Sequence, residues 1–517
     1  MRALDVLRRA SPFRSRGGGS GARVRRTCRI PARKAETYTR RYFGRITQGS
    51  AMSRPATLGE LRASGWVSQP IKEELRANAV RVLASGDTLV EGVIGYDDTV
   101  IPQLANALLA GHDIVFLGER GQAKTRIMRG LVGLLDEWMP IIEGSEINDD
   151  PYNPVSSHAR KLVEEHGDEA PIDWVHRDRR FGEKLATPDT SIADLIGEVD
   201  PIKVAEGRYL SDELTIHYGL VPRTNRGIFA INELPDLAER IQVGLLNVLE
   251  ERDVQIRGYK IRLPLDVMLV ASANPEDYTN RGRIITPLKD RFGSQIRTHY
   301  PLETELEVAI IHQEVRPLTA EQLQVTVPEF MTEIVAEISQ HARQSPHVNQ
   351  RSGVSARLSI ANYETLVANA ARRALANDER EVVPRVSDLD ALAASTSGKI
   401  EIEMLDDGRD SQVLDRIIKS AVLEVFRARV KPEMLGTVVA SFEDGSVVHT
   451  GEDVPSSEYR KLVDQIEGLK PLLASLGVGE SPAACASGIE FVLEGLHLTK
   501  RLNKDALGGR ATYRARG

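Results

Sequence analysis

The sequence predicts an α/β fold, in which helices flank a parallel sheet, followed by a mostly helical carboxyl-terminal region. Three short apolar runs, at 113–117, 227–231 and 267–271, each end in a glycine-rich turn or in polar residues. Such runs are typical of buried parallel strands. Helical spacing of apolar residues surrounds them, and strand patterns fade after Pro301. Ligands of open α/β sheets bind where the strands end, so the polar residues at these ends are the first candidates for a site.

Length and composition limit the class of protein. The chain has 517 residues, 41% of them hydrophobic and 27% charged, which suits two or three globular domains. No apolar run reaches the roughly 18 residues of a membrane span. Cys28 and Cys485 are too few for a disulfide framework or a cysteine zinc site. We therefore expect a folded cytoplasmic protein without a membrane partner.

The net charge of −7 conceals a basic leader. Residues 1–51 contain fourteen basic and two acidic residues, which leaves an acidic body. Because Met52 opens a plausible second start, the leader is either an over-called beginning of the reading frame or a disordered basic arm, with a transit peptide as a further option. Proteins that bind DNA present a basic face, so no DNA partner is expected for the body.

Helical and polar segments connect the three apolar runs. Helices are predicted over 65–85, 99–110 and 237–253, and the last is followed by a β-hairpin around Gly258. The polar stretch 146–224 is predicted to form loops with short helices. Helical patterns return over 304–377 and 411–429, and a further helix-like segment covers 489–502. The expected divisions are a leader at 1–51, a helical lead-in at 52–90, an α/β domain at 91–300, a helical lid at 301–400 and a mostly helical region at 401–517.

A glycine-containing loop directly after the first run is the sharpest chemical signal. Its glycines allow backbone N–H groups to surround phosphate oxygens, and the following helix offers its positive end. Lys124 is placed to bridge the β- and γ-phosphates of a nucleotide, and Thr125 to hold Mg²⁺. Ala123 stands where a glycine usually precedes the lysine, so spacing alone leaves a chance loop as an alternative, which the strand–loop–helix context disfavours. The predicted nucleotide-binding residues of this loop are Gly118, Glu119, Arg120, Gly121, Gln122, Ala123, Lys124 and Thr125.

The second apolar run ends in Asn232 and Glu233. Nucleotide hydrolases often place an acidic pair here, of which the first orients water on Mg²⁺ and the second polarises the attacking water. Asn232 can accept a hydrogen bond from a metal-bound water but brings no charge, so slower hydrolysis or weaker Mg²⁺ binding is expected. Taken alone, Glu233 is equally well explained as a solvated carboxylate at a strand end.

Three further residues are candidates for catalysis. Asn274 follows the third run, where an amide can orient the lytic water or contact the γ-phosphate, although Asn-Pro is by itself a turn signal. Arg291 and Arg357 each lie beside a predicted helix, and guanidinium groups at a γ-phosphate accelerate phosphoryl transfer strongly. The alternative for either arginine is an ordinary surface ion pair.

Taken in order, these segments resemble the AAA+ ATPases, and more narrowly the clade of the magnesium chelatase ATPase subunit and the MoxR-type chaperones. The resemblance covers about residues 88 to 370. The phrases that carry it are the loop with Ala123, Arg226-Gly-Ile-Phe-Ala-Ile-Asn-Glu-Leu-Pro-Asp236, the hairpin, Ala273-Asn-Pro-Glu276, Asp290-Arg-Phe-Gly293 and Gly353-Val-Ser-Ala-Arg357.

The resemblance implies a role for each candidate residue. Lys124 and Thr125 correspond to the Walker A pair, and Glu233 corresponds to the Walker B glutamate. Ile94 and Gly95 resemble the contact beside the adenine. The remaining roles implied are sensor 1 for Asn274, an arginine finger reaching a neighbouring subunit for Arg291, and sensor 2 for Arg357.

An arginine finger that acts on a neighbour needs a ring, so the resemblance implies a homo-oligomer with six subunits as the expected number. The hairpin, with Arg257, Lys260 and Arg262, is either a pore-facing or partner-facing element or a solvated hairpin.

The first functional interpretation is an ATP- and Mg²⁺-dependent motor that remodels a partner protein, such as one with a von Willebrand A domain. The second is the motor of a true magnesium chelatase, acting through a large porphyrin-binding subunit. The third, suggested by Asn232, is a nucleotide-binding regulator with weak hydrolysis. A sigma-54-type activator is weaker still, because neither its characteristic loop sequence nor a helix-turn-helix is found.

Overall fold

The structure is a computed structural model that describes residues 54–199, 216–250, 253–255, 262–274, 282–349, 353–401, 410–507 and 509–516. The predicted leader at 1–51 lies outside these residues. Residues Arg54–Gly517 cluster as a single unit. Within the part of the chain that the structure describes, no helix is both long and apolar enough to cross a membrane.

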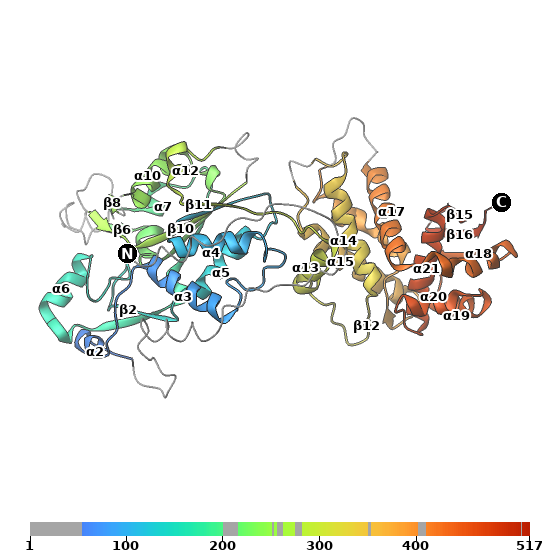
Figure 1. The fold of residues 1–517 in the computed structure, drawn as a ribbon, viewed down its shortest axis with the longest axis horizontal. Coiled ribbons are helices and arrows are strands. Elements are labelled where there is room, and N and C mark those ends of the chain that lie inside the picture. Colours follow the sequence, from blue (N-terminus) through green and yellow to red (C-terminus); the bar gives the residue numbers. More distant parts are fainter. Residues whose placement is uncertain are drawn as a thin grey trace, which may run out of the picture. The chain divides into compact units, whose positions relative to one another are not determined.

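A parallel five-stranded sheet forms the centre of the amino-terminal half (Figure 1). All four neighbouring pairs are parallel. The three predicted apolar runs are three adjacent strands in the middle of this sheet, and their polar ends meet at one edge. In sheet order the strands are β11 (Ser294–Arg297), β1 (Ile114–Leu117), β10 (Val267–Ala273), β7 (Gly227–Asn232) and β4 (Phe181–Leu185).

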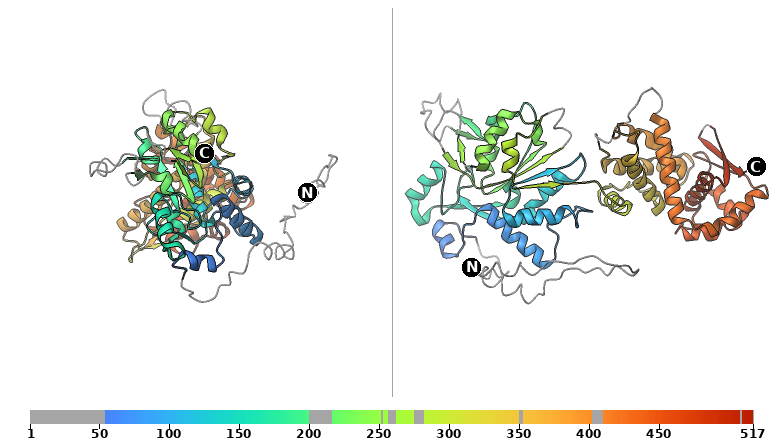
Figure 2. Two further views of the ribbon diagram at one scale, coloured as in Figure 1. Left: turned by 90° about the vertical axis from the view of Figure 1, so that its left-hand side faces the viewer. Right: turned by 45° about the horizontal axis from the view of Figure 1, so that its top comes forward.

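Helices cover both faces of this sheet because its strands are apolar on both sides. On one face, residues such as Ile114, Ile228 and Val270 pack with α3, α4 and α5. On the other, residues such as Val115 and Phe229 pack with α10 and α12. Figure 2 shows this layering. The bounds are α3 (Ile71–Ser85), α4 (Val100–Ala110), α5 (Lys124–Gly130), α10 (Glu239–Glu250) and α12 (Thr286–Arg291).

Helix boundaries follow local capping chemistry. α3 begins after Pro70 rather than at residue 65, because proline fixes its own backbone and is tolerated at the start of a helix. α3 and α4 end at Gly86 and Gly111, both in the left-handed conformation that glycine adopts most easily. The predicted helices over 99–110 and 237–253 are confirmed as α4 and α10, with ends shifted by at most three residues.

The prediction of loops and short helices over 146–224 was wrong in one important respect. This stretch supplies β4, the edge strand of the central sheet, which pairs with β7 from Phe181↔Ile228 to Leu185↔Asn232. The strand was missed because Gly182, Glu183 and Lys184 interrupt any apolar pattern, as an edge strand tolerates. The remaining elements here and in the adjoining segments are α2 (Leu58–Ala63), η1 (Leu131–Leu134), β2 (Trp138–Ile142), α6 (Ser157–His166), η2 (Gly167–Glu169), β3 (Ile172–His176), η3 (Arg177–Arg180), α7 (Ile192–Leu195), β5 (Gly197–Val199), β6 (Ile216–Tyr218), α9 (Leu220–Arg223) and η5 (Leu234–Asp236).

The predicted hairpin is present as an antiparallel pair of β8 (Asp253–Gln255) and β9 (Arg262–Pro264). Arg257 and Lys260 lie outside the described residues, and the structure does not describe the side chain of Arg262. The pore-facing role of the hairpin therefore stays a prediction.

The carboxyl-terminal half is mostly helical, as predicted. The helix expected over 489–502 departs from the prediction, because it ends earlier, as α21. Leu502 instead begins a strand of a small antiparallel sheet in the order β14-β16-β15, which was not predicted. The bounds are α13 (Thr304–Glu314), β12 (Gln324–Val325), α14 (Glu329–Gln344), α15 (Arg357–Ala376), β13 (Glu381–Val382), η6 (Val386–Leu392), α16 (Ala393–Ser397), α17 (Asp410–Arg429), η7 (Pro432–Met434), α18 (Leu435–Glu443), β14 (Val448–Gly451), α19 (Ser456–Gln465), α20 (Leu469–Ser475), α21 (Pro482–Leu498), β15 (Leu502–Leu507) and β16 (Arg510–Ala515).

Candidate nucleotide-binding site

The glycine-containing loop connects β1 to α5 at the edge where the central strands end. Gly121 has φ +75° and Ala123 has φ +53°, so both lie in the left-handed region. Glycine adopts this conformation without steric cost, whereas the Cβ of alanine makes it less favourable. The chain therefore keeps the backbone path of the loop although Ala123 replaces the usual glycine.

Lys124 lies within the curve of this loop. It is 6% exposed, and its ammonium donates hydrogen bonds to the carbonyl of Gly118 and, at 2.7 Å, to that of Glu119. Its charge is thus held by the loop that would surround a phosphate, because buried ammonium groups require such partners. A phosphate is a stronger partner than a neutral carbonyl, so this lysine is suited to exchange these contacts for phosphate oxygens.

Gln122 anchors the loop to the neighbouring strand. Its side-chain carbonyl accepts from the Glu119 backbone N–H at 3.1 Å and from the Thr298 hydroxyl at 2.7 Å. Gly118 permits this packing, since a Cβ there would collide with both Thr298 and Gln122. These contacts of Gln122 with Gly118, Glu119 and Thr298 therefore fix the conformation of the loop.

Tyr96, in the segment before α4, supports the loop and was missed by the sequence analysis. Its hydroxyl lies near the backbone carbonyls of Gln122 and His299, at 2.9 and 2.7 Å, and its ring packs edge-on against His299. Burial raises the pKa of Tyr96 to about 12, although the contact with His299 acts in the opposite direction. The nearby Ile94-Gly95 phrase was the available signal for this residue.

Asn232 and Glu233 lie at the end of β7, next to the loop. The Thr125 hydroxyl donates to Asn232 Oδ1 at 3.0 Å. Glu233 has φ +53°, and its backbone N–H donates to the Ser272 hydroxyl of β10 at 3.1 Å. A strained backbone at the end of a buried strand is typical of functional sites.

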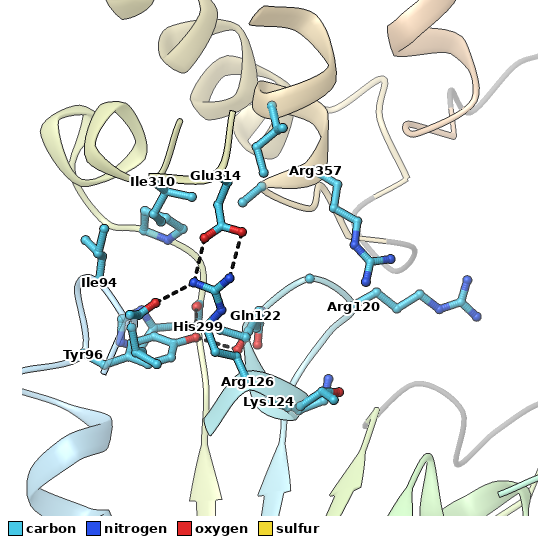
Figure 3. A pocket seen from close by; sticks show the side chains of 18 of the residues that line it. Ile94, Tyr96, Arg120, Gln122, Lys124, Arg126, His299, Ile310, Glu314 and Arg357 are labelled. Atoms are coloured by element: carbon cyan, nitrogen blue, oxygen red, sulfur yellow. Dashed lines mark hydrogen bonds and ion pairs between the residues drawn. The ribbon is translucent and has the colours of Figure 1, made fainter. Parts of the chain in front are cut away.

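A cavity of about 450 Å³ opens between the loop and the helices that follow the sheet, a volume within the range of small-molecule sites. Figure 3 shows Arg357 extending from α15 toward the loop that carries Arg120. Ile94, Ile310 and Ile360 give the cavity an apolar part. The predicted residues that line it are Ile94, Arg120, Gly121, Gln122, Ala123, Lys124, Thr125, Glu233 and Arg357.

The other predicted residues do not line this cavity. Asn232 contacts Thr125 instead, and Asn274 is buried directly after β10. Arg291 ends α12 with its side chain 36% exposed, 3.4 Å from Asp290. Gly95, Gly118 and Glu119 are also absent from the cavity lining.

Arg126 joins the loop helix to α13 across the cavity (Figure 3). Its guanidinium lies 2.6 Å from the Glu314 carboxylate and donates to the carbonyl of Gly92 at 2.8 Å. Gln313 donates to the same carbonyl at 2.9 Å. No motif in the sequence indicated these residues, because their partners come from distant segments.

The donor set fits a nucleotide with a divalent cation. A buried ammonium, a hydroxyl, a carboxylate and an arginine line the cavity together with apolar side chains, and an amide oxygen lies beside the hydroxyl. The phosphates of a nucleotide require such polar groups, and its base requires apolar ones. The site and the sheet order together define a P-loop protein of the AAA+ class.

Comparisons with known proteins agree with this class. The family model of the sigma-54 interaction domain matches residues 206–291. The chain is 28% identical over 229 residues to magnesium-chelatase subunit ChlI of Nostoc, and 28% identical over 234 residues to the magnesium-chelatase 38 kDa subunit of Rhodobacter capsulatus. These matches cover 43% of this chain and 57% and 59% of the relatives. The chain thus has the AAA+ fold and is similar to the ATPase subunits of magnesium chelatase, and it spans less than two thirds of the length of these relatives.

A solved structure gives a weaker likeness. A complex between subunits BchI and BchD of magnesium chelatase, based on cryo-EM, aligns with a TM-score of 0.33 and 20% identity. The alignment covers 64% of this chain and 94% of that one.

Proposed function

We propose that the chain is an ATPase that binds ATP in the 450 Å³ cavity and hydrolyses it. The observation that carries this proposal is that Lys124 and Thr125 from the loop, Glu233 directly after β7 and Arg357 from α15 line one cavity. These four groups come from three separate segments, and phosphoryl transfer needs each type of group.

The residues have distinct roles in this proposal. Lys124 and the loop N–H groups hold the phosphates, and Arg357 contacts them from α15. Glu233 orients and polarises the attacking water as a general base. Asn274 contacts the γ-phosphate side as sensor 1, and Ile94 and Gly95 lie beside the adenine.

Thr125 and Asn232 are the residues that would hold Mg²⁺, the latter through water. A bound Mg²⁺ neutralises charge that develops on the phosphates.

We propose further that the protein acts as a ring, with six subunits expected, in the cytoplasm. The exposed position of Arg291 at the end of α12 supports a role in a neighbouring subunit's site, since it does not reach its own cavity. In this reading ATP hydrolysis remodels a partner protein, either a von Willebrand A protein or a chelatase-type large subunit. The second candidate, the motor of a true magnesium chelatase, is favoured by the similarity to ChlI.

A regulator with weak hydrolysis is the remaining alternative, motivated by Asn232. The match to the sigma-54 interaction domain falls within the α/β domain and supports the shared ATPase architecture.

ATP turnover and nucleotide binding test the ATPase proposal. Lys124→Ala is expected to abolish nucleotide binding, and Glu233→Gln to bind ATP but stall turnover. Normal turnover by Glu233→Gln would remove its catalytic role. Nucleotide affinity retained by Lys124→Ala would refute the phosphate site.

The partner is then identified by co-purification from native cells with the Glu233→Gln protein, loaded with ATP. Recovery of a large porphyrin-binding subunit would support the chelatase motor. Recovery of a von Willebrand A protein without that subunit would support the remodelling function. Turnover close to background in the unaltered protein would favour the regulator.

A further inference from the structure

The carboxylate of Glu183 contacts Asn232, the uncharged residue that we propose helps to hold Mg²⁺. Asn232 Nδ2 donates to Glu183 Oε1 at 2.6 Å. Glu183 belongs to β4, the neighbouring strand that the sequence analysis missed. A negative charge is therefore present one side chain away from the position where the AAA+ resemblance leads one to expect an aspartate.

The hydrogen bonds fix which end of the Asn232 amide faces the site. An amide nitrogen only donates and an amide oxygen only accepts. Because Glu183 takes the nitrogen, the oxygen turns toward the hydroxyls of Thr125 and Ser272, at 3.0 and 3.3 Å. A hydrogen bond to an ionised acceptor is roughly twice as strong as a neutral one, so Glu183 is the stronger of the groups that orient Asn232.

The charge of Glu183 also acts through this bond. Hydrogen bonds in a chain polarise one another, and this effect grows where water is partly excluded. The Glu183 side chain is 23% exposed and Asn232 is 7% exposed. The carboxylate therefore increases the negative charge on Asn232 Oδ1, the atom next to Thr125.

Arg129 forms an ion pair with Glu183 in the structure. It lies four residues after Thr125 on α5, hence on the same helix face. Its guanidinium forms two hydrogen bonds to the carboxylate, at 2.7 and 3.0 Å, and this contact raises the pKa of Arg129. With 64% of the Arg129 side chain exposed, the pair is accessible to solvent and to competing cations.

We propose that Glu183 is a positioning residue for the metal ion of the nucleotide site. It supplies, through the Asn232 amide, the negative charge that Asn232 itself lacks. This inference rests on the proposed function, because it concerns the divalent cation that accompanies the nucleotide.

Metal binding tests this inference apart from catalysis. Mn²⁺ replaces Mg²⁺ as a paramagnetic probe, and its affinity for the full-length protein with a non-hydrolysable ATP analogue is measured by electron paramagnetic resonance. Glu183→Gln is expected to weaken Mn²⁺ binding by about tenfold or more, the usual effect of removing a partner of a metal ligand. Its affinity for the analogue in EDTA stays within about twofold of the unaltered protein. The matched control is Glu164→Gln, at an exposed glutamate of α6, which leaves both values unchanged.

Two further variants separate the charge from the ion pair. The double variant Asn232→Asp with Glu183→Gln moves the carboxylate to the strand end while keeping a donor beside it, and is expected to regain Mn²⁺ affinity. Arg129→Gln removes the guanidinium but leaves Glu183 and Asn232 in contact, so Mn²⁺ affinity is maintained or increased.

Unchanged Mn²⁺ affinity in Glu183→Gln, with normal binding by the unaltered protein, would overturn this inference alone. An equal loss in Arg129→Gln, or no recovery in the double variant, would also overturn it, since the ion pair rather than the charge would then matter. Failure of the unaltered protein to bind the analogue at all would instead refute the proposed function.

Discussion

Replacing Glu74 by glutamine is expected to unfold the α/β domain at a much lower temperature. Glu74 on α3 accepts two hydrogen bonds from Arg180, at 2.8 and 2.6 Å, and one from the Asp136 backbone N–H at 2.7 Å. Arg180 is 1% exposed and also donates hydrogen bonds to the backbone carbonyl of Arg226, the residue directly before β7. This ion pair therefore ties α3 to the strands that carry Glu183 and Asn232.

The magnitude follows from what remains after the substitution. Removal of one partner from a buried ion pair typically costs about 3–5 kcal/mol, because the other charge is left in a dry interior. Here the environment is already unfavourable for positive charge: burial lowers the pKa of Arg226, and Glu74 is one of the carboxylates that partly offset this. For a domain of roughly 150–250 residues, 1 kcal/mol corresponds to about 2–4 °C, so the midpoint should fall by ~6–20 °C.

Tryptophan fluorescence provides the assay, since the three tryptophans, Trp66, Trp138 and Trp174, all belong to the amino-terminal half. The control is Glu73→Gln, the adjacent position. Its exposed pair with Arg76 on the same helix is worth about 0.3–0.5 kcal/mol, so ~1–2 °C is expected. If the thermal midpoint of Glu74→Gln falls by less than about 3 °C, a decrease comparable with that of this control, the argument that the buried pair stabilises the strands is refuted.

Three other predictions address the site. Arg291→Ala should keep its oligomeric mass in light scattering but lose about 10³-fold or more of ATP turnover, and full turnover would refute the arginine-finger role. The pKa of Tyr96 is about 12 in the folded protein, whereas an unfolded tyrosine ionises near 10, so the free energy of unfolding falls between these pH values. In urea titrations, Tyr96→Phe should lack this part of the alkaline loss of stability. Identical pH profiles of stability for Tyr96→Phe and the unaltered protein would contradict this prediction. Gly121→Ala meets both a left-handed backbone, costing roughly 1–2 kcal/mol, and the Ser355 hydroxyl, so its thermal midpoint should fall and Ser355→Gly should recover part of the loss; no recovery would show that Ser355 does not crowd this glycine.

The sequence predicted the centre of the sheet because its strands are continuous apolar runs. Every residue of β1, β7 and β10 is buried, so each stands out against polar flanks. The loop spacing predicted Lys124 and Thr125 as site residues, and the end of the second apolar run predicted Glu233; all three line one cavity, and their roles stay predictions. Local sequence patterns are therefore sufficient to predict strands that are completely buried and loops in which a ligand requires a fixed spacing of residues.

Residues whose role depends on strand pairing were not predictable in this way. Glu183 lies within a polar-looking edge strand, and only the pairing of β4 with β7 brings it to Asn232. Likewise Arg126 finds Glu314 at a separation of 188 residues. The small sheet of β14, β15 and β16 was missed because its strands carry no apolar run, and β15 and β16 each bury a single residue.

The hydrophobic core of the helical half continues across residue 400, and this limits how its role can be studied. Phe330 of α14 stacks on Phe491 of α21 with ring centroids 4.4 Å apart, and Glu333 of α14 pairs with Arg429 of α17. Such a core is close-packed and resists internal sliding. A movement of α13 through its contact with Arg126 would therefore carry the carboxyl-terminal helices with it. Removing residues 401–517 would remove the packing partners of α14. Loss of function after this truncation would therefore reflect unfolding. Only surface substitutions can identify a partner-binding face in this region.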